Sequence, residues 1–277
     1  MPFDARRYYY YYSTETRGCK KAGSLGGGFS AAAVALFAAM AVQPDATRKT
    51  LIDTFIKALI SAGVWTLLDV LYVFAAHTEQ AALLNWKAPG TFDGTSVSAT
   101  AFTTDVGFTG DAVADYINTN FNPFSAGGSY TQDSASFGAR TTTDRSDNAD
   151  KCLIGWTAGT AVSILRTDSG SGFGTINVNG SGANLQGAAT GLGWWGVTTT
   201  SNAAVMDVYR DGAAFNSGVR TSAALADGST FQVLAIAASN FSDEVANSAF
   251  IGGQLSSAQM AAFYAAELAY MQAVGAV

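Results

Sequence analysis

Hydrophobic and polar residues alternate along Val205–Arg210, where Met206 and Val208 occupy every second position. Because successive side chains of a strand point to opposite faces, this alternation predicts a half-buried strand. Asp211-Gly212 follows directly, and this dipeptide accepts the positive φ angles that a tight hairpin turn requires. The pattern therefore predicts a hairpin whose second strand runs through Ala214–Val219.

Short apolar segments recur from residue 91 onward and are separated by turns rich in Gly, Asn, Asp and Ser. This spacing favours an antiparallel sandwich or barrel over alternating βαβ units. We therefore predict a mainly β fold with an antiparallel β-sandwich. The other strand candidates are Val97–Thr103, Asp115–Thr119, Ser134–Ala139, Lys151–Trp156, Ala161–Arg166, Gly174–Val178, Gly193–Thr199 and Thr230–Ala237.

Residues 44–90 have a helical period instead. Apolar residues recur every four positions along Leu51–Leu59, with charged residues between them, which predicts an amphipathic helix. Apolar residues also recur at steps of three and four along residues 64–75, which predicts a second helix and hence a helical hairpin. A third, short helix is expected over residues 78–86.

A serine pair introduces the last predicted element. A serine side chain at a helix start accepts a hydrogen bond from a backbone N–H group that has no partner within the helix. We therefore predict an amphipathic C-terminal helix with a serine N-cap. Ser256-Ser257 stands ahead of apolar residues at helical spacing, which are Met260, Phe263, Tyr264, Leu268 and Met271.

The first part of the chain contains the tyrosine run Tyr8–Tyr12, with basic residues on both sides. Tyrosine favours strands, but a run without alternation does not determine which face is buried. We expect this segment to depend on a partner for its order, and a strand added to the open sheet edge of a neighbour would supply one.

The apolar run over residues 29–42 has fourteen residues, too few for a membrane-spanning helix, which needs about 20. Together with the basic leader and Ala39-Met40-Ala41, the run is similar to a secretory signal peptide. Because the chain retains Met1, we expect instead a helix that packs on protein.

Charge is scarce and unevenly distributed. Only 13% of the 277 residues are charged and the net charge is −6, while 48% of residues are hydrophobic, so we expect an ordered chain with a large core. The first 30 residues carry five basic and two acidic side chains, which leaves −9 for the remainder. A body this acidic is unsuited to nucleic acid, because phosphate contacts need clustered Lys and Arg.

The cysteine and histidine content excludes several kinds of site. Cys19 and Cys152 are far apart in the sequence, so they form no disulfide framework. The single histidine, His77, excludes the usual zinc sites and any Ser-His or Cys-His pair that does not use it. We interpret His77 as the end of the second predicted helix.

Three segments, in this order, resemble laminin-G-like and concanavalin-like jelly rolls. They are Gly107–Phe121 (GFTGDAVADYINTNF), Val208–Gly212 (VYRDG) and Ala249–Ser257 (AFIGGQLSS), which leads into the C-terminal helix. More narrowly, the chain is similar to versions carried by bacteriophage and prophage structural proteins, in which a helical segment such as TLIDTFIKAL and GVWTLLD precedes the sandwich. The resemblance covers residues 44–277, and residues 1–43 lie outside it.

This resemblance implies three parts: residues 1–43 as an N-terminal arm and apolar helix, 44–90 as a helical segment, and 91–277 as the sandwich with its C-terminal helix. It implies a virion structural protein, such as a fibre or decoration component of the head or tail. The arm would anchor the chain to other virion subunits, and the protein would form homo-oligomers, with trimers common among phage fibres. The alternative is a secreted or surface adhesin that binds carbohydrate and uses residues 1–43 for export.

Concanavalin-like relatives include glucanases, so a glycoside hydrolase must also be considered. Such enzymes use two positioned carboxylates, and the glucanases carry them in a Glu-x-Asp-x-Glu strand. This strand is absent, and Glu244 is the only glutamate of residues 91–277 outside the predicted C-terminal helix. We therefore predict a protein that is not an enzyme and has no catalytic residues.

A glycan of the host surface is the expected ligand, and its binding residues stay unassigned except for one hypothesis. Trp194-Trp195 should place one indole in the core and the other outward, where it could stack on a sugar ring. The alternative is that the helical segment covers both indoles. No cofactor is expected, although Asp105, Asp111 and Asp115 offer oxygen ligands for calcium without EF-hand spacing.

Overall fold

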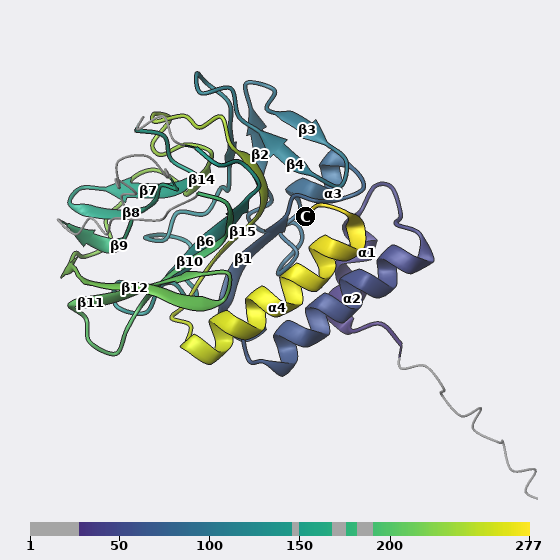
Figure 1. The fold of residues 1–277 in the computed structure, drawn as a ribbon, viewed down its shortest axis with the longest axis horizontal. Coiled ribbons are helices and arrows are strands. Elements are labelled where there is room, and N and C mark those ends of the chain that lie inside the picture. Colours follow the sequence, from purple (N-terminus) through teal and green to yellow (C-terminus); the bar gives the residue numbers. More distant parts are fainter. Residues whose placement is uncertain (1–27, 146–149, 168–175, 182–190) are drawn as a thin grey trace, which may run out of the picture.

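Two antiparallel sheets and a layer of helices are stacked on one another (Figure 1). The computed structural model describes residues 28–145, 150–167, 176–181 and 191–277. The chain is therefore mainly β, as predicted, with helices before the sandwich and one helix after it. None of the described helices is both long and apolar enough to cross a membrane.

The predicted hairpin forms one end of the larger sheet, called sheet A. Strands β11 (Val205–Arg210) and β12 (Ala213–Val219) pair antiparallel, and Asp211 and Gly212 have φ angles of 48° and 73°. A Cβ on Gly212 would lie 2.9 Å from ring atoms of Tyr264. Both the turn and this close approach therefore require glycine at position 212.

Sheet A has eight strands, and its centre is β15 (Val245–Gly252). β15 pairs with β6, β4 and β1, so segments far apart in the sequence meet along one strand. From one edge to the other the order is β12, β11, β10 (Gly193–Thr199), β6 (Ser136–Thr141), β15, β4 (Gly107–Thr109) and β3 (Ala101–Thr103), with β1 (Leu68–Val73) also paired to β15.

Sheet B has seven strands and faces sheet A across the aromatic core. Phe231, for example, lies 5.6 Å from Phe137 of sheet A and 6.1 Å from Trp156 of sheet B, measured between ring centroids. The strand order is β13 (Thr221–Ser222), β9 (Ile176–Ser181), β8 (Ala161–Leu165), β7 (Ile154–Ala158), β14 (Gln232–Val233), β5 (Tyr116–Asn118) and β2 (Thr95–Val97).

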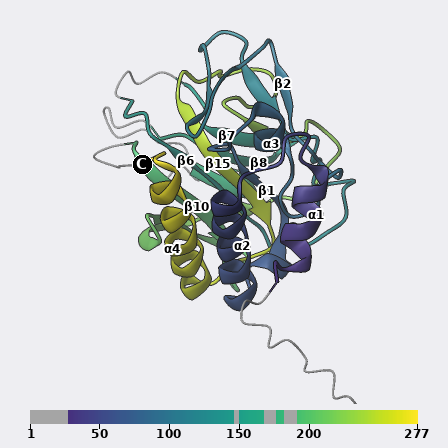
Figure 2. The same cartoon turned by 90° about the vertical axis from the view of Figure 1, so that its right-hand side faces the viewer.

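The helices cover the face of sheet A that points away from sheet B (Figures 1 and 2). α4 (Ser257–Val274) packs beside α2 (Ala46–Ser61), and α1 (Ala31–Ala39) packs on α2. The predicted serine N-cap is confirmed, because Ser256 and Gln259 form a reciprocal capping box. The 29–42 run does pack on protein, through a buried face that includes Leu36 and Phe37.

The second helix of the predicted hairpin does not form. A short 3-10 turn, η1 (Trp65–Leu67), leads into β1, and all but one residue of that strand are buried. The apolar run of β1 satisfies both a helical and a buried-strand pattern, and pairing with β15 selects the strand. His77 consequently follows a strand, and the predicted third helix is α3 (Glu79–Leu83).

A buried ion pair fastens α4 to sheet A. The Arg140 guanidinium on β6 donates to both carboxylate oxygens of Glu267 on α4, at 2.6–2.9 Å. Ser248 on β15 donates to the same carboxylate at 2.7 Å. The Arg140 and Glu267 side chains are only 5% and 1% exposed, so each charge depends on the other for its solvation.

Arg140→Met should therefore lower the free energy of unfolding by about 3–5 kcal/mol, because it leaves Glu267 buried without its counter-ion. Urea denaturation followed by tryptophan fluorescence measures this loss. The double variant Arg140→Met/Glu267→Leu should recover most of the loss, since it removes both charges. A single variant within about 1 kcal/mol of the parent protein would show that water or another group replaces the arginine.

Candidate functional site

Neither indole of Trp194-Trp195 is available to a ligand, so the predicted exposed tryptophan is wrong. Both side chains are 1% exposed. Trp194 stacks on Phe250 at 5.4 Å and lies against Phe263 of α4. Trp195 lies on the opposite face of β10, where its Nε1 donates to the Gly191 carbonyl at 2.8 Å. Opposite faces of one strand are both buried because sheet A lies between the helices and sheet B.

Two of the three aspartates considered for calcium, Asp105 and Asp111, have separate structural tasks. Asp105 pairs with Arg48 at 2.7 Å. Asp111 Oδ1 accepts the backbone N–H groups of Val113, Ala114 and Asp115 at 2.8–2.9 Å, and these bonds lower the pKa of Asp111. No group of three or more His, Cys, Asp or Glu side chains suited to a metal ion occurs among the described residues.

Glu244, the glutamate considered for hydrolysis, is enclosed within the protein. Its side chain is completely buried and accepts hydrogen bonds from the hydroxyls of Thr167 and Ser242. A guanidinium nitrogen of Arg145 lies 3.8 Å from the same carboxylate. Burial raises the pKa of Glu244 against the effect of these partners. A carboxylate without access to solvent has no route to a glycosidic bond.

A surface pocket of about 370 Å³ lies between α3 and the loop that leads to β2. Its walls combine aliphatic and polar side chains. Glu79 lies in the first turn of α3, where the positive end of the helix dipole favours a carboxylate. The pocket is lined by Glu79, Gln80, Leu83, Leu84, Asp93 and Gly94.

The loop wall of the pocket is held rigidly by Asn85. This side chain is completely buried; its oxygen accepts from Leu71 N–H, and its amide donates to the carbonyls of Asp69 and Thr91. The carboxylate of Asp93 accepts from the backbone of Asn85 at 2.8 Å and so closes the loop. Such a loop presents its surface groups without a further cost of ordering on ligand binding.

The helical wall is tied to α1. Gln80 accepts from the Ala41 N–H at 3.0 Å and donates to the Ala39 carbonyl at 3.1 Å. Gly94 N–H donates to the Leu83 carbonyl at 2.6 Å, which joins the two walls. Unlike Gln80, Glu79 has no hydrogen bond to a neighbouring segment in the described structure. The pocket thus offers the Glu79 carboxylate beside a fixed aliphatic surface.

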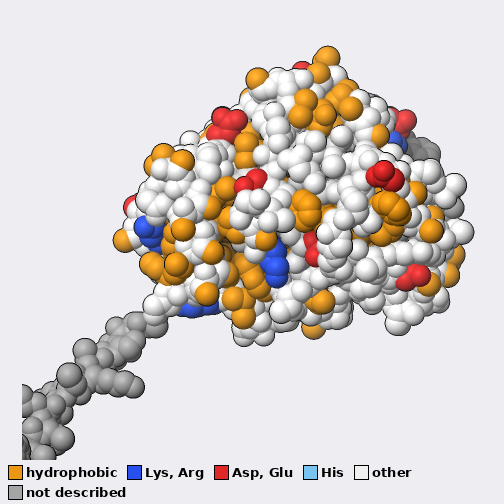
Figure 3. All heavy atoms as spheres, turned by 180° about the vertical axis from the view of Figure 1, so that it is seen from behind, with side chains coloured by type: hydrophobic (Ala, Val, Ile, Leu, Met, Phe, Trp, Pro, Cys, Tyr) orange, Lys and Arg blue, Asp and Glu red, His pale blue; other side chains and the backbone are white. Residues whose placement is uncertain are grey.

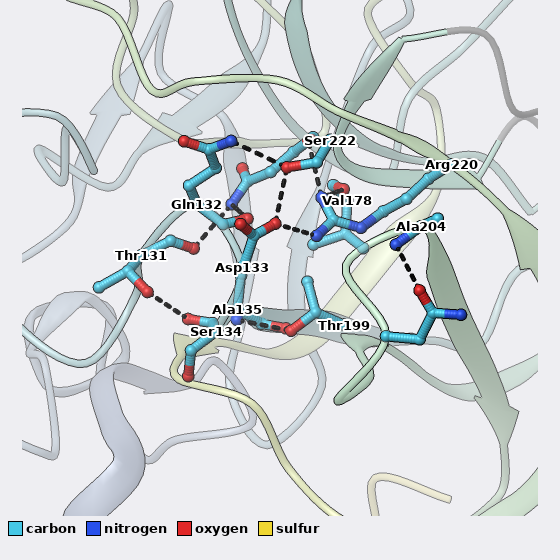
Figure 4. A network of polar contacts seen from close by, with 12 residues as sticks. Thr131, Gln132, Asp133, Ser134, Ala135, Val178, Thr199, Ala204, Arg220 and Ser222 are labelled. Carbon is cyan, nitrogen blue, oxygen red and sulfur yellow. Dashed lines mark hydrogen bonds and ion pairs between the residues drawn. The ribbon is translucent and has the colours of Figure 1, made fainter.

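A second polar cluster closes the edge of the sandwich (Figure 4). Arg220, whose side chain is fully buried, donates to the carbonyls of Val178 and Asn179 and pairs with Asp133 at 2.6 Å. Ser222 also donates to Asp133, at 2.6 Å. These bonds join the turn before β6 to strands β9 and β13, so the cluster has a structural role.

Comparison with known proteins adds information on the fold. No family model matches the chain, and neither does any curated protein. A Trypanosoma rangeli sialidase mutant with trans-sialidase activity is similar at TM-score 0.54 and 12% identity, over 80% of this chain and 39% of that chain. Since the identity is so low, this similarity shows a shared fold and nothing further.

Two other solved structures match less well. Trypanosoma rangeli sialidase in complex with sialic acid has TM-score 0.44 and 11% identity, over 78% of this chain and 38% of that one. The botulinum neurotoxin serotype D binding domain has TM-score 0.44 and 11% identity, over 73% and 52%. The chain therefore spans about two-fifths to one half of the length of these proteins.

The sequence pattern did not single out the pocket. Its polar residues are separated by fourteen positions at most, yet Glu79 was interpreted only as the start of a short helix. The usable signal was Asn85, a polar residue inside an otherwise apolar segment beside Trp86. A buried amide of this kind usually organises a loop by bonding to its backbone.

Because burial raises the pKa of Glu244, its ionisation opposes folding. The stabilising contribution of the protonated form is fully present below the unfolded-state value of 4.5 and is lost as the pH rises through the folded-state pKa. The difference in unfolding free energy between Glu244→Gln and the parent should therefore shift in favour of the variant from pH 4 to pH 7. Urea denaturation across this range, with Glu79→Gln as the exposed control, tests the sign. A constant difference would show that Glu244 has the same pKa in the folded and unfolded states.

Proposed function

We propose that this chain is a carbohydrate-binding module without enzymatic activity, carried by a bacteriophage structural protein. The observation that supports it most is the preformed pocket between α3 and the loop before β2. Its volume of about 370 Å³ falls within the roughly 300–1,000 Å³ typical of small-ligand sites. The shared fold with a sialidase is compatible with a role in sugar recognition.

The chemistry of the pocket favours neutral or amino sugars. The aliphatic side chains of Leu83 and Leu84 suit the C–H face of a pyranose ring. Glu79 and Asp93 supply carboxylate acceptors for hydroxyl or ammonium groups. Two carboxylates at one site would repel an anionic sugar such as a sialic acid. We therefore propose uncharged or aminated glycans of a host surface as the ligands.

The tasks of the carboxylates support binding over catalysis. Glu267 is buried in a hydrogen-bonded ion pair with Arg140, and Glu244 is buried beside Arg145 and accepts hydrogen bonds from two hydroxyl groups. At the pocket, Asp93 accepts backbone N–H groups on both oxygens, from Asn85 at 2.8 Å and Gly90 at 3.0 Å. Because both oxygens hold the loop backbone, Asp93 is a poor partner for Glu79 in the acid and base pair of a glycosidase, although each oxygen keeps a lone pair that can accept from a sugar.

A glycan array should show binding to neutral or amino sugars and none to sialylated ones. Glu79→Gln should weaken the selected glycan roughly tenfold by calorimetry, because it replaces a charged acceptor with a neutral one. Asp150→Asn is the matched control, since Asp150 is an exposed carboxylate outside the pocket. This variant should bind the selected glycan with the affinity of the parent protein.

Three results would contradict this proposal. Binding that is unaffected by Glu79→Gln would place the sugar elsewhere on the protein. Absence of binding to every glycan would remove the carbohydrate role. Reproducible release of reducing ends from β-glucans or host polysaccharides would make the protein a hydrolase.

Residues 1–43 are proposed as the attachment element on the particle. Residues 1–27 lie outside the described part of the chain, and the described part begins beside an uncovered apolar surface. Phe29, Val34 and Val42 are 43%, 52% and 56% exposed. Hydrophobic side chains gather on this flank in Figure 3. Exposed apolar side chains grouped in this way are typical of a contact with another protein.

Deletion of residues 1–28 should abolish incorporation into particles and leave the sandwich folded, because the first described helix starts at Ala31. Quantitative immunoblots of purified particles measure incorporation, and circular dichroism of the free protein checks the fold. Incorporation at the normal level would show that the arm is not the anchor. Recovery of the full chain only as a free monomer in the medium would favour a secreted adhesin.

A further inference from the structure

β1 ends sheet A beside β4, and its outer side is bonded to Asn85 and Trp86 of the loop after α3. Of the four other edges of the two sheets, one differs from the rest. β3 at one edge of sheet A has three residues, and the edges of sheet B are β13 with two and β2 with three. Short edge strands give an incoming strand little to pair with. β12, at the other edge of sheet A, has seven residues.

β12 also lacks the side chains that usually protect an edge. Its sequence, Ala-Ala-Phe-Asn-Ser-Gly-Val, contains no charged residue and no proline. Val219 at its end is 74% exposed. Lysine, inward charge and proline are the common means of preventing pairing with another chain, and β12 has none of them. Within the described part of the chain, sheet A ends at this strand.

The ends of β12 are fixed in place. The Asp211-Gly212 turn holds its start, and the buried Arg220 follows its last residue directly. The backbone N–H of Arg220 donates to the Ala204 carbonyl at 2.8 Å, on the turn before β11. Between these ends β12 has one irregularity in its pairing with β11, where Val208 faces Asn216 and Tyr209 faces Ala214. An edge held at both ends is ordered, so an incoming strand meets a fixed template.

We propose that Tyr8–Tyr12 of one copy pairs as an added strand with β12 of another copy. This deepens the proposed anchoring role of the arm and rests on it. A five-residue run with high strand propensity fits within the seven residues of β12 and is longer than β2, β3 or β13. Backbone hydrogen bonds supply the attraction in such pairing, so a run without alternation is suitable.

The placement of β12 favours a second copy over the same chain. β12 and α1, which follows the arm, lie on opposite flanks of the molecule (Figure 1). An arm that leaves one flank and binds the other flank of its neighbour makes a head-to-tail contact. Such contacts build closed rings or open filaments, according to the rotation between copies. Both outcomes are suited to a component of a particle.

Disulfide trapping tests this contact directly. Full-length Tyr10→Cys and Ala214→Cys chains, both with Cys19→Ser, are purified separately, mixed and oxidised. Cys152 is completely buried, so its thiol does not compete. We expect a covalent heterodimer on a non-reducing gel. Absence of the heterodimer would overturn the proposal, as would a double-cysteine chain that cross-links only within itself.

Sedimentation of the uncross-linked full chain gives an independent measurement. Ala214→Lys places a positive charge on exposed β12 next to the basic arm and should weaken self-association at least tenfold. Replacing Tyr8–Tyr12 with serines should have the same effect. Thr95→Lys on the exposed but short β2 is the control and should associate as the parent does. Equal association of all variants would refute pairing at β12. These measurements use neither glycan nor phage particles. A negative result would therefore refute the strand pairing without refuting the proposed glycan binding or anchoring.

Discussion

The structure depends on the burial of both faces of sheet A. Sheet B covers one face with aromatic side chains, and α2 and α4 cover the other. The Arg140–Glu267 pair lies at the second interface. The two side chains are 5% and 1% exposed, respectively, so water solvates neither charge. The hydrogen bonds of this pair form only when α4 lies at its observed position on sheet A, so the ion pair specifies where the helix lies. Apolar contacts supply most of the stability.

Buried polar groups in this protein join segments that are distant in sequence. Arg220 joins two sheets at their edge, Asn85 closes a loop, and Glu244 is bonded to neighbouring hydroxyls. Each buried group of this kind would cost free energy if left without a partner. Because these groups are occupied by structural bonds, the groups able to meet a ligand are those at the surface, such as Glu79 in its pocket.

The same constraint explains why the tryptophan pair is internal. On a two-layer sandwich with one solvated face, adjacent residues of a strand divide between core and surface. Here the helical layer adds a third layer, and Trp194 packs on Phe250 and Phe263 beneath it. Surface recognition is thereby shifted from the sheet face to loops and edges, where the pocket and β12 lie.

The sequence by itself determined the elements whose signals are local: the Asp211-Gly212 hairpin, the serine-capped α4, the amphipathic α2 and the antiparallel β class. Only the tertiary structure decided the rest. β1 satisfied two patterns until β15 paired with it, and neither Trp194-Trp195 nor the pocket could be placed without knowing the third layer. A local sequence pattern indicates which residues are buried. Whether sheet B or a helix buries them depends on contacts between segments that are distant in the sequence.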